Sequence, residues 1–192
     1  QRQYFPRLLA VENDPRVKLI FEDGAHYVRS AADRGERFDA VLIDSTDFSQ
    51  AAPLFTNAFY QACRALVAPS ADRRGGIVAY NVDSPQWHEP WVVRAHTQAN
   101  ELFVHAHLFQ VYQPTFSSGH YSFMLASDSI HPFRTPPDWA AFEAKQIPTE
   151  YYSPDVHYAA FVLPAALQRR LGSTLRLQDL ASAPHAFSQS SS

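Results

Sequence analysis

The sequence predicts an open α/β sheet, in which buried strands alternate with covering helices. Short continuous apolar runs, typical of strands covered on both faces, alternate in the first hundred residues with longer segments that repeat apolar residues at helical spacing. Beyond residue 103, two strand-like runs follow each other directly, which predicts an antiparallel pair. Apolar residues make up 46% of the 192 residues and charged residues 18%, so the chain can bury one sizeable core.

The first predicted elements are a strand at 17–23 ("VKLIFED") and a helix over 24–35, closed by its final glycine. A second strand at 38–44 ("FDAVLID") is a continuous apolar run of strand length. The segment "FTNAFYQACRALVAP" repeats apolar groups at helical spacing, with Thr56 as N-cap and Pro69 as a stop.

The next predicted elements are a strand at 75–82, which follows a glycine turn, and a helix at 90–103. The runs "FVHAHLFQVY" (103–112) and "HYSFMLASD" (120–128) predict an antiparallel pair that closes one edge of the sheet. Two short helices, "DWAAFEAKQ" and "PAALQRRL", lie in the proline-rich segment that follows. Strands and helices in this alternation indicate parallel crossovers.

Composition argues against several classes of function. The net charge is −3 with no lysine or arginine block, which argues against nucleic acid and anionic lipid as partners. No run approaches 18 apolar residues, and the N-terminus lacks the pattern of a signal peptide, so we expect no membrane and a cytoplasmic location. The one cysteine, Cys63, reads as a small buried hydrophobe rather than a nucleophile.

Acidic and amide residues follow three of the predicted strands. Asp44 and Asp47 end the run "AVLIDSTD", while Asp23 with Gly24, and the segment 81–83, end the neighbouring runs. In open α/β sheets, ligands bind beyond the carboxyl ends of the strands, so these groups should share one edge. A lone aspartate after a strand is commonly a helix cap, which remains an alternative for Asp23. The Asp44/Asp47 pair favours a cationic ligand.

Six segments together resemble the spermidine synthases, the polyamine aminopropyltransferases: "DPRVKLIFEDGAHYV", "FDAVLIDSTD", "LFTNAFYQACRALVAPSADRRGGIVA", "SPQW", "PTFSSGHYSFMLAS" and "YYSPDVHYAAFVLP". The resemblance implies a Rossmann-like sheet of the S-adenosylmethionine-methyltransferase type, with strand order 3-2-1-4-5-7-6. In that order, two strands that are not in this chain separate 17–23 from 38–44, so the sheet should be incomplete at its N-terminus. The implied division is a partial catalytic domain at 1–175 and a tail at 176–192.

The resemblance also implies a reaction, the transfer of an aminopropyl group from decarboxylated S-adenosylmethionine to putrescine. The products are spermidine and methylthioadenosine. The first compound is a co-substrate, and no cofactor or metal is implied. Asp44 matches the general base and Asp47 the group that holds the diamine's cation. Phe116, Trp87 and Asn81 are further candidates for the diamine site. The candidates for binding decarboxylated S-adenosylmethionine are Asp23, Gly24, Ser45, Ala51, Ala52 and Leu54.

Several positions depart from the family pattern. Phe116 stands where the family usually has a tyrosine that positions the amine, and Asn81 stands where a glutamine is common. The family's β-rich domain, glycine-rich loop and ribose-binding acid would precede this chain. We therefore expect the chain to act as part of a longer enzyme that forms a homodimer or homotetramer. The alternative is a non-catalytic truncated remnant that keeps a polyamine-binding or interaction surface.

Other constellations have ordinary structural explanations. His105 and His107 share one face of a strand but lack a third ligand at metal-binding spacing. Asp155 and His157 suggest a catalytic dyad, but no nucleophile accompanies them.

The remaining signals are two glycines and two tryptophans. Gly75 and Gly76 precede a strand, so they predict a turn and not a phosphate-binding loop. Trp87 and Trp91 are four residues apart and are expected to pack; the alternative for Trp87 is that it borders the diamine channel.

Overall fold

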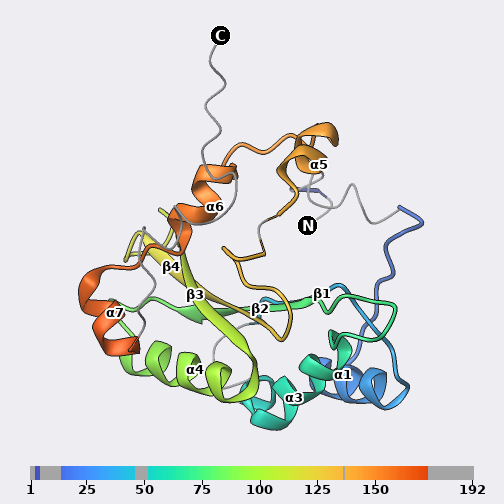
Figure 1. The fold of residues 1–192 in the computed structure, drawn as a ribbon. Coiled ribbons are helices and arrows are strands. Elements are labelled where there is room, and N and C mark those ends of the chain that lie inside the picture. Colours follow the sequence, from blue (N-terminus) through green and yellow to red (C-terminus); the bar gives the residue numbers. More distant parts are fainter. Residues whose placement is uncertain (1–2, 5–13, 46–51, 136, 173–192) are drawn as a thin grey trace.

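The structure is a computed structural model that describes residues 3–4, 14–45, 52–135 and 137–172. Its centre is a four-stranded sheet in the order β1-β2-β4-β3 (Figure 1). β1 pairs parallel to β2, and the other two pairings are antiparallel. The predicted open sheet with an antiparallel pair at one edge is therefore confirmed. The strands are β1 (Ala40–Ile43), β2 (Ile77–Asp83), β3 (His105–Tyr112) and β4 (His120–Ser127).

Helices lie on both sides of this sheet. In Figure 1, α1, α3 and α4 lie along one side, while α5 and α6 lie on the other. The N-caps explain where the first helices begin, because Asp23 accepts a hydrogen bond from the His26 amide and Thr56 accepts one from the Phe59 amide. The helical elements are α1 (Gly24–Asp33), η2 (Ala52–Phe55), α3 (Asn57–Leu66), α4 (Glu89–Leu102), α5 (Trp139–Ala144), α6 (Pro154–Ala160) and α7 (Ala165–Leu171).

Two apolar clusters hold these layers together. The larger cluster lies between the sheet and the helices α1, α3, α4 and α7, and it includes Val78, Tyr80, Val82 and Met124. Since side chains alternate along a strand, the residues between these positions face the other side. The smaller cluster covers that other side, where Phe133 packs with residues of α6 and the far face of β3 and β4.

The strand predicted at 17–23 is not formed. Val17, Leu19 and Ile20 are 40–55% exposed in this segment, and Phe21 is 93% exposed. The physical reason is the lack of a pairing partner, because an isolated strand in water cannot satisfy its backbone groups. Leu42 of β1 is also exposed, at 74%, and β1 is an edge strand of the sheet.

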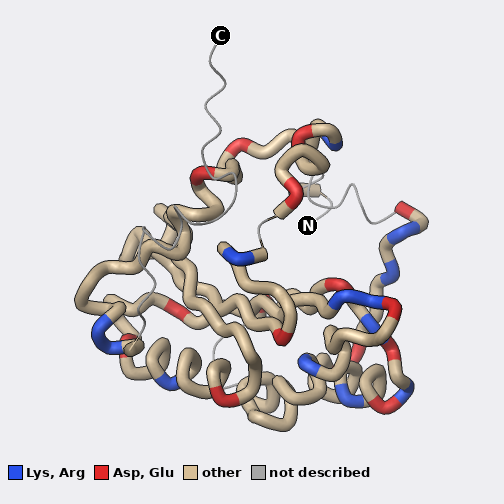
Figure 2. Tube along the Cα trace, in the orientation of Figure 1, with Lys and Arg blue, Asp and Glu red and all other residues tan. Residues whose placement is uncertain are grey.

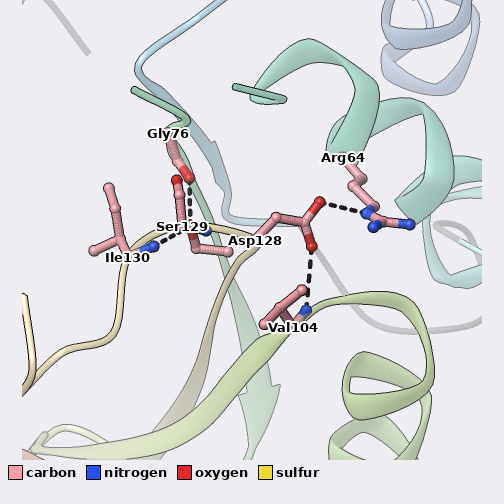
Figure 3. A network of polar contacts seen from close by, with 7 residues as sticks. Arg64, Gly76, Val104, Asp128, Ser129 and Ile130 are labelled. Carbon is pink, nitrogen blue, oxygen red and sulfur yellow. Dashed lines mark hydrogen bonds and ion pairs between the residues drawn. The ribbon is translucent and has the colours of Figure 1, made fainter. Parts of the chain in front are cut away.

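One end of the sheet, at the start of β2 and β3 and the end of β4, is closed by polar contacts (Figure 3). The Asp128 carboxylate accepts hydrogen bonds from Arg64 Nε at 2.6 Å and from the Val104 amide at 3.1 Å. The hydroxyl of buried Ser127 donates to the Gly76 carbonyl at 2.8 Å and accepts from the Ile130 amide at 3.0 Å. We call this region the closed end.

The two glycines before β2 belong to the closed end. A Cβ on Gly76 would overlap the carbonyl of Asp39, and one on Gly75 would lie 2.5 Å from Ser129 Oγ. The turn predicted at these glycines lies earlier, between Ser70 and Arg73, and the glycines are needed because backbone and side chains approach them closely. Figure 2 shows acidic and basic residues interspersed around the described chain, in keeping with the small net charge.

Candidate active site

The opposite end of the sheet gathers most of the described site residues. We call it the rim and define it as Asp44, Ser45, Asn81, the loop 83–87 and the hairpin loop 113–119. The pairing of Ile43 with Tyr80 brings the ends of β1 and β2 together, and the pairing of β2 with the start of β4 adds the hairpin. The predicted clustering of polar groups at the carboxyl ends of β1 and β2 is therefore confirmed.

Asp44 and Ser45 directly follow β1. The Asp44 side chain is exposed, so its carboxylate is open to a ligand. Behind it, the Asn81 amide donates a hydrogen bond through Nδ2 to the Ser45 carbonyl at 3.0 Å. This bond crosses from β2 to the end of β1 and fixes the backbone that carries Asp44.

Two polar atoms at the rim are buried and have no hydrogen-bond partner among the described residues. These atoms are Ser45 Oγ and Asn81 Oδ1. Buried polar groups in proteins are nearly always paired, because an unmade hydrogen bond costs about 1–3 kcal/mol. Such orphan atoms are typical of a site where a ligand or water supplies the missing partner.

The loop after β2 is held in an unusual conformation. Asp83 has a φ of 80°, and the pairing register shifts between Asn81 and Asp83. The Asp83 carboxylate contacts His88 Nδ1 at 2.9 Å, while Ser84 is buried and its hydroxyl accepts from the Gln86 amide. Strain of this kind is held in place by surrounding contacts and concentrates at functional sites.

The two tryptophans near this loop behave differently. Trp91 packs edge-to-face on Phe55, with ring centroids 5.7 Å apart. Trp87 is 63% exposed, so the prediction that both tryptophans pack is wrong for Trp87. The cause is that α4 begins at Glu89, so Trp87 lies in the loop before the helix and Trp91 lies on the helix itself. An exposed aromatic at the rim is a suitable wall for a ligand.

The hairpin loop brings Phe116 to the same edge. Backbone hydrogen bonds from the Phe116 amide to Gln113 and from the Gly119 amide to Phe116 hold the loop. The Phe116 ring packs on Tyr121 with centroids 4.8 Å apart, yet Phe116 remains 49% exposed. Phe116 therefore packs on one side and presents its other side to solvent at the rim.

The candidates for nucleoside binding lie in two neighbouring elements. Asp23 caps α1, accepting from the His26 amide at 2.7 Å, so the cap alternative is confirmed for one of its oxygens. A Cβ on Gly24 would lie 3.7 Å from Leu54 Cδ2, which shows that α1 and η2 meet at this point. Ala52 is exposed at the start of η2. The predicted residues Asp47 and Ala51 lie outside the described residues.

Two alternative catalytic hypotheses find no support in the described chain. Cys63 is fully buried, and burial raises the pKa of its thiol to about 12, so it is a core residue as predicted. His157 contacts the Tyr152 hydroxyl through Nδ1 at 3.1 Å instead of forming a dyad with Asp155.

The histidine pair on β3 has a third neighbour that the sequence did not indicate. The ring centroid of His131 lies 4.6 Å from that of His107 and 5.3 Å from that of His105. His131 Nδ1 accepts from the amides of Phe133 and Arg134, which occupies that nitrogen. Among the described residues, no group of three or more histidine, cysteine or carboxylate side chains is arranged to hold a metal ion.

Sequence reasoning missed the contacts that support the rim. The Asp83–His88 contact, the buried Ser84 and the Phe116–Tyr121 stack come from tertiary structure. The only sequence signal was the segment "DSP" directly after a strand.

No helix in the described ranges is both long and apolar enough to cross a bilayer.

Comparisons with known proteins point in one direction. The sequence model of the spermine/spermidine synthase domain matches residues 1–135. The chain is 34% identical over 173 residues to a polyamine aminopropyltransferase of Clostridium perfringens, covering 88% of this chain and 58% of that protein. A polyamine aminopropyltransferase of Moorella thermoacetica is 33% identical over 172 residues, covering 88% of this chain and 56% of the relative.

Solved structures give the same result. A spermidine synthase crystallised with the transition-state analogue AdoDATO superposes with a TM-score of 0.78 at 29% identity, over 89% of this chain and 56% of that structure. The spermidine synthase of Thermotoga maritima gives a TM-score of 0.76 at 29% identity, over 89% of this chain and 55% of that structure. The chain thus spans less than three fifths of the length of these relatives.

Proposed function

Because this chain belongs to the spermine/spermidine synthase family, we propose that it carries the amine-side half of an aminopropyltransferase site and acts as part of a longer enzyme. The proposed reaction transfers the aminopropyl group of decarboxylated S-adenosylmethionine to putrescine, giving spermidine and methylthioadenosine. Decarboxylated S-adenosylmethionine is a co-substrate, so the reaction needs no cofactor.

The observation that carries this proposal is the rim around Asp44. An exposed carboxylate stands at the end of a parallel strand, on a backbone fixed by Asn81, with two buried polar atoms beside it that lack partners among the described residues. A diamine needs such acceptors, because each ammonium group donates up to three hydrogen bonds. Phe116 and Trp87 add half-exposed aromatic surface for its aliphatic chain.

The protein has two main tasks in this reaction, to align the two substrates and to remove a proton from the attacking amine. The amine nitrogen attacks the methylene carbon next to the sulfonium, the new C–N bond forms as the C–S bond breaks, and the electron pair neutralises the sulfur. The attacking nitrogen must first lose a proton, which Asp44 accepts. Aligning the two reactants within about 3–3.5 Å accounts for much of the acceleration in reactions of this kind.

The nucleoside half of the site rests on fewer groups. Gly24 and Leu54 are in contact range across α1 and η2, which supports a shared adenine-binding surface. One carboxylate oxygen of Asp23 accepts the helix-cap hydrogen bond from the His26 amide, and the second oxygen is the acceptor proposed for the adenine edge.

The test is an assay of methylthioadenosine release from putrescine and decarboxylated S-adenosylmethionine. We expect no release from residues 1–192 alone. We expect release when the chain is fused behind the part of the Clostridium perfringens relative that precedes the aligned region. A folded fusion that binds both substrates but shows no turnover would contradict the proposal.

A second candidate is a chain that acts only as an interaction surface. The observations that favour it are the exposed apolar side chains of Leu42 and of the segment 17–21, with Phe21 93% exposed. Under this alternative, the fusion would fold and remain inactive; strong binding of a hydrophobic dye by the isolated chain is expected under both candidates. Homodimer or homotetramer formation of the longer enzyme stays a prediction, to be measured by light scattering on the fusion.

A further inference from the structure

The loop after β2 is one tight turn that ends where α4 begins. The Ser84 carbonyl accepts hydrogen bonds from the Trp87 amide at 3.2 Å and from the His88 amide at 2.9 Å. His88 is the last residue before α4. Trp87 therefore lies inside a turn whose two ends are Asp83 and His88, and we call this segment the 83–88 turn.

Asp83 adopts a backbone conformation that is costly for most residues. Its φ of 80° lies in the left-handed region, which aspartate tolerates better than most side chains do. Both oxygens of its carboxylate are engaged, since Oδ1 accepts from the Ser84 amide and Oδ2 lies 2.9 Å from His88 Nδ1. A carboxylate only accepts hydrogen bonds, so His88 Nδ1 carries the proton of this contact and donates it.

Helix capping does not explain the histidine at position 88. His88 occupies the N-cap position of α4, where serine, threonine, aspartate and asparagine are preferred, and its side chain makes no capping hydrogen bond. Its imidazole contacts Asp83 instead and joins the two ends of the turn. The His88 side chain is 60% exposed, and exposed ion pairs contribute little to global stability. The contact should therefore act on the conformation of the turn and not on the stability of the fold.

The position of Trp87 depends on the backbone of the turn. Its side chain is 63% exposed and makes no hydrogen bond or ring contact with the described residues. We infer that His88 is a positioning residue, which donates to Asp83 and thereby keeps the 83–88 turn in the conformation that presents Trp87 at the rim. The inference rests on the proposed function, in which Trp87 contacts the alkyl chain of the diamine. His88 contacts no reacting atom and acts only through the turn.

The structural test is ¹⁹F NMR of chain 1–192 with 5-fluorotryptophan at its three tryptophans, with Trp87→Phe to assign the Trp87 signal. Asparagine can donate from a side-chain amide near the position of Nδ1, whereas alanine cannot. His88→Ala should shift and broaden the Trp87 signal relative to His88→Asn. Neither replacement carries a ring, so this difference reports the contact with Asp83 and not the loss of the imidazole. Identical Trp87 signals in the two variants would overturn the inference.

Two further variants serve as controls for the Trp87 signal. Asp83→Gly keeps the left-handed backbone but removes the carboxylate, so in that background His88→Asn and His88→Ala should give the same signal. A difference that persists there would place the partner of His88 elsewhere and overturn the assignment. His26→Ala removes another exposed histidine, whose Nδ1 lies 3.4 Å from Glu22 Oε2 outside the rim, and it should leave the Trp87 signal unchanged.

The functional test uses the fusion described above. His88→Ala should raise KM for putrescine about fivefold, the scale of one hydrogen bond, while kcat and KM for decarboxylated S-adenosylmethionine stay unchanged. Such a split indicates lost binding without lost transition-state stabilisation. His88→Asn should restore KM. A merely structural role would lower the urea midpoint and affect both substrates, and that result would overturn the inference.

The two tests separate this inference from the proposed function. Turnover with an unchanged KM for putrescine in His88→Ala would overturn the role of His88 and leave the proposed function standing. A fusion without turnover, in which the Trp87 signal still differs between His88→Asn and His88→Ala, would overturn the proposed function and support the assignment of the turn to His88.

Discussion

The two ends of the same sheet differ in whether their polar groups are paired within the protein. At the closed end, Asp128 satisfies both Arg64 and a backbone amide, and Ser127 joins two chain segments. At the rim, Asp44 is exposed, and buried oxygens of Ser45 and Asn81 lack partners among the described residues. Polar groups that are paired internally stabilise the fold, while polar groups left open are available to a ligand. The difference separates residues that hold the sheet together from residues that a ligand could contact.

The largest expected effect comes from a glycine at the closed end. Gly76→Ala should lower the free energy of unfolding by about 3 kcal/mol, because the new Cβ overlaps the Asp39 carbonyl and the backbone must move. The matched control is Gly119→Ala in the rim hairpin, where φ is +70° but no atom is within 4 Å. It should cost about 1 kcal/mol from strain alone. Urea unfolding measures both, and equal losses would contradict the contrast between the ends.

At the rim, we expect a substitution to lower the catalytic rate and to leave the free energy of unfolding nearly unchanged. In the active fusion, Asp44→Asn should lower kcat at least about 100-fold, the usual scale for loss of a general base. Its free energy of unfolding should change by no more than about 0.5 kcal/mol, because the side chain is exposed. Steady-state kinetics and urea unfolding test the two halves of this prediction. Turnover like that of the unchanged fusion would remove Asp44 from the base role.

The closed-end carboxylate should matter through its backbone contact more than through its ion pair. Asp128→Ala should cost about 1.5 kcal/mol of unfolding free energy, since the Val104 amide loses a charged acceptor. Arg64→Gln should cost less than about 1 kcal/mol, because the Arg64 side chain is 45% exposed and surface pairs contribute little. If Arg64→Gln proved the more harmful of the two, the ion pair would be the main contact.

The free energy of unfolding should decrease at acidic pH because of His107, which lies on β3. Burial, with help from neighbouring His131 and His105, lowers the pKa of His107 from its usual value to about 3. The unfolded chain therefore binds one more proton at this residue between about pH 6.5 and pH 3, so stability falls as pH falls through that window. His107→Gln should flatten the slope of unfolding free energy by up to about 1.4 kcal/mol per pH unit. An unchanged slope between pH 6.5 and 4 would contradict this.

The smallest expected effect concerns the aromatic at the rim. Phe116→Tyr in the fusion adds a hydroxyl where the family usually has one, and it should tighten putrescine binding by about 1 kcal/mol, the net contribution of one hydrogen bond. Phe116 is half exposed, so the new hydroxyl meets no packing penalty. Isothermal titration with putrescine measures the change. Unchanged or weaker affinity would show that the packing of Phe116 on Tyr121 points the ring away from the amine.

Much of the architecture followed from local chemistry in the sequence. Thr56 and Asp23 mark helix starts because their side chains accept amide hydrogens that a helix leaves unpaired. The continuous apolar runs at 38–44 and 75–82 became β1 and β2, and β2 buries every second residue, whereas β1 is only half-buried at the edge of the sheet. Asp44 became a candidate because it ends such a run, and the segments that resemble the family were specific enough to predict the family that the domain match shows.

Tertiary structure alone decided the rest. The apolar run at 17–23 has strand character, but a strand requires a partner for its backbone groups, and the described chain provides none. The ring of His131 contacts those of His105 and His107, and Glu89 forms an ion pair with Arg170. These residues are far apart in the sequence, so hydrophobic periodicity does not predict their contacts. The sequence determined which groups could act and where elements begin, because those depend on near neighbours. The buried oxygens without partners at the rim exist only because distant segments pack together.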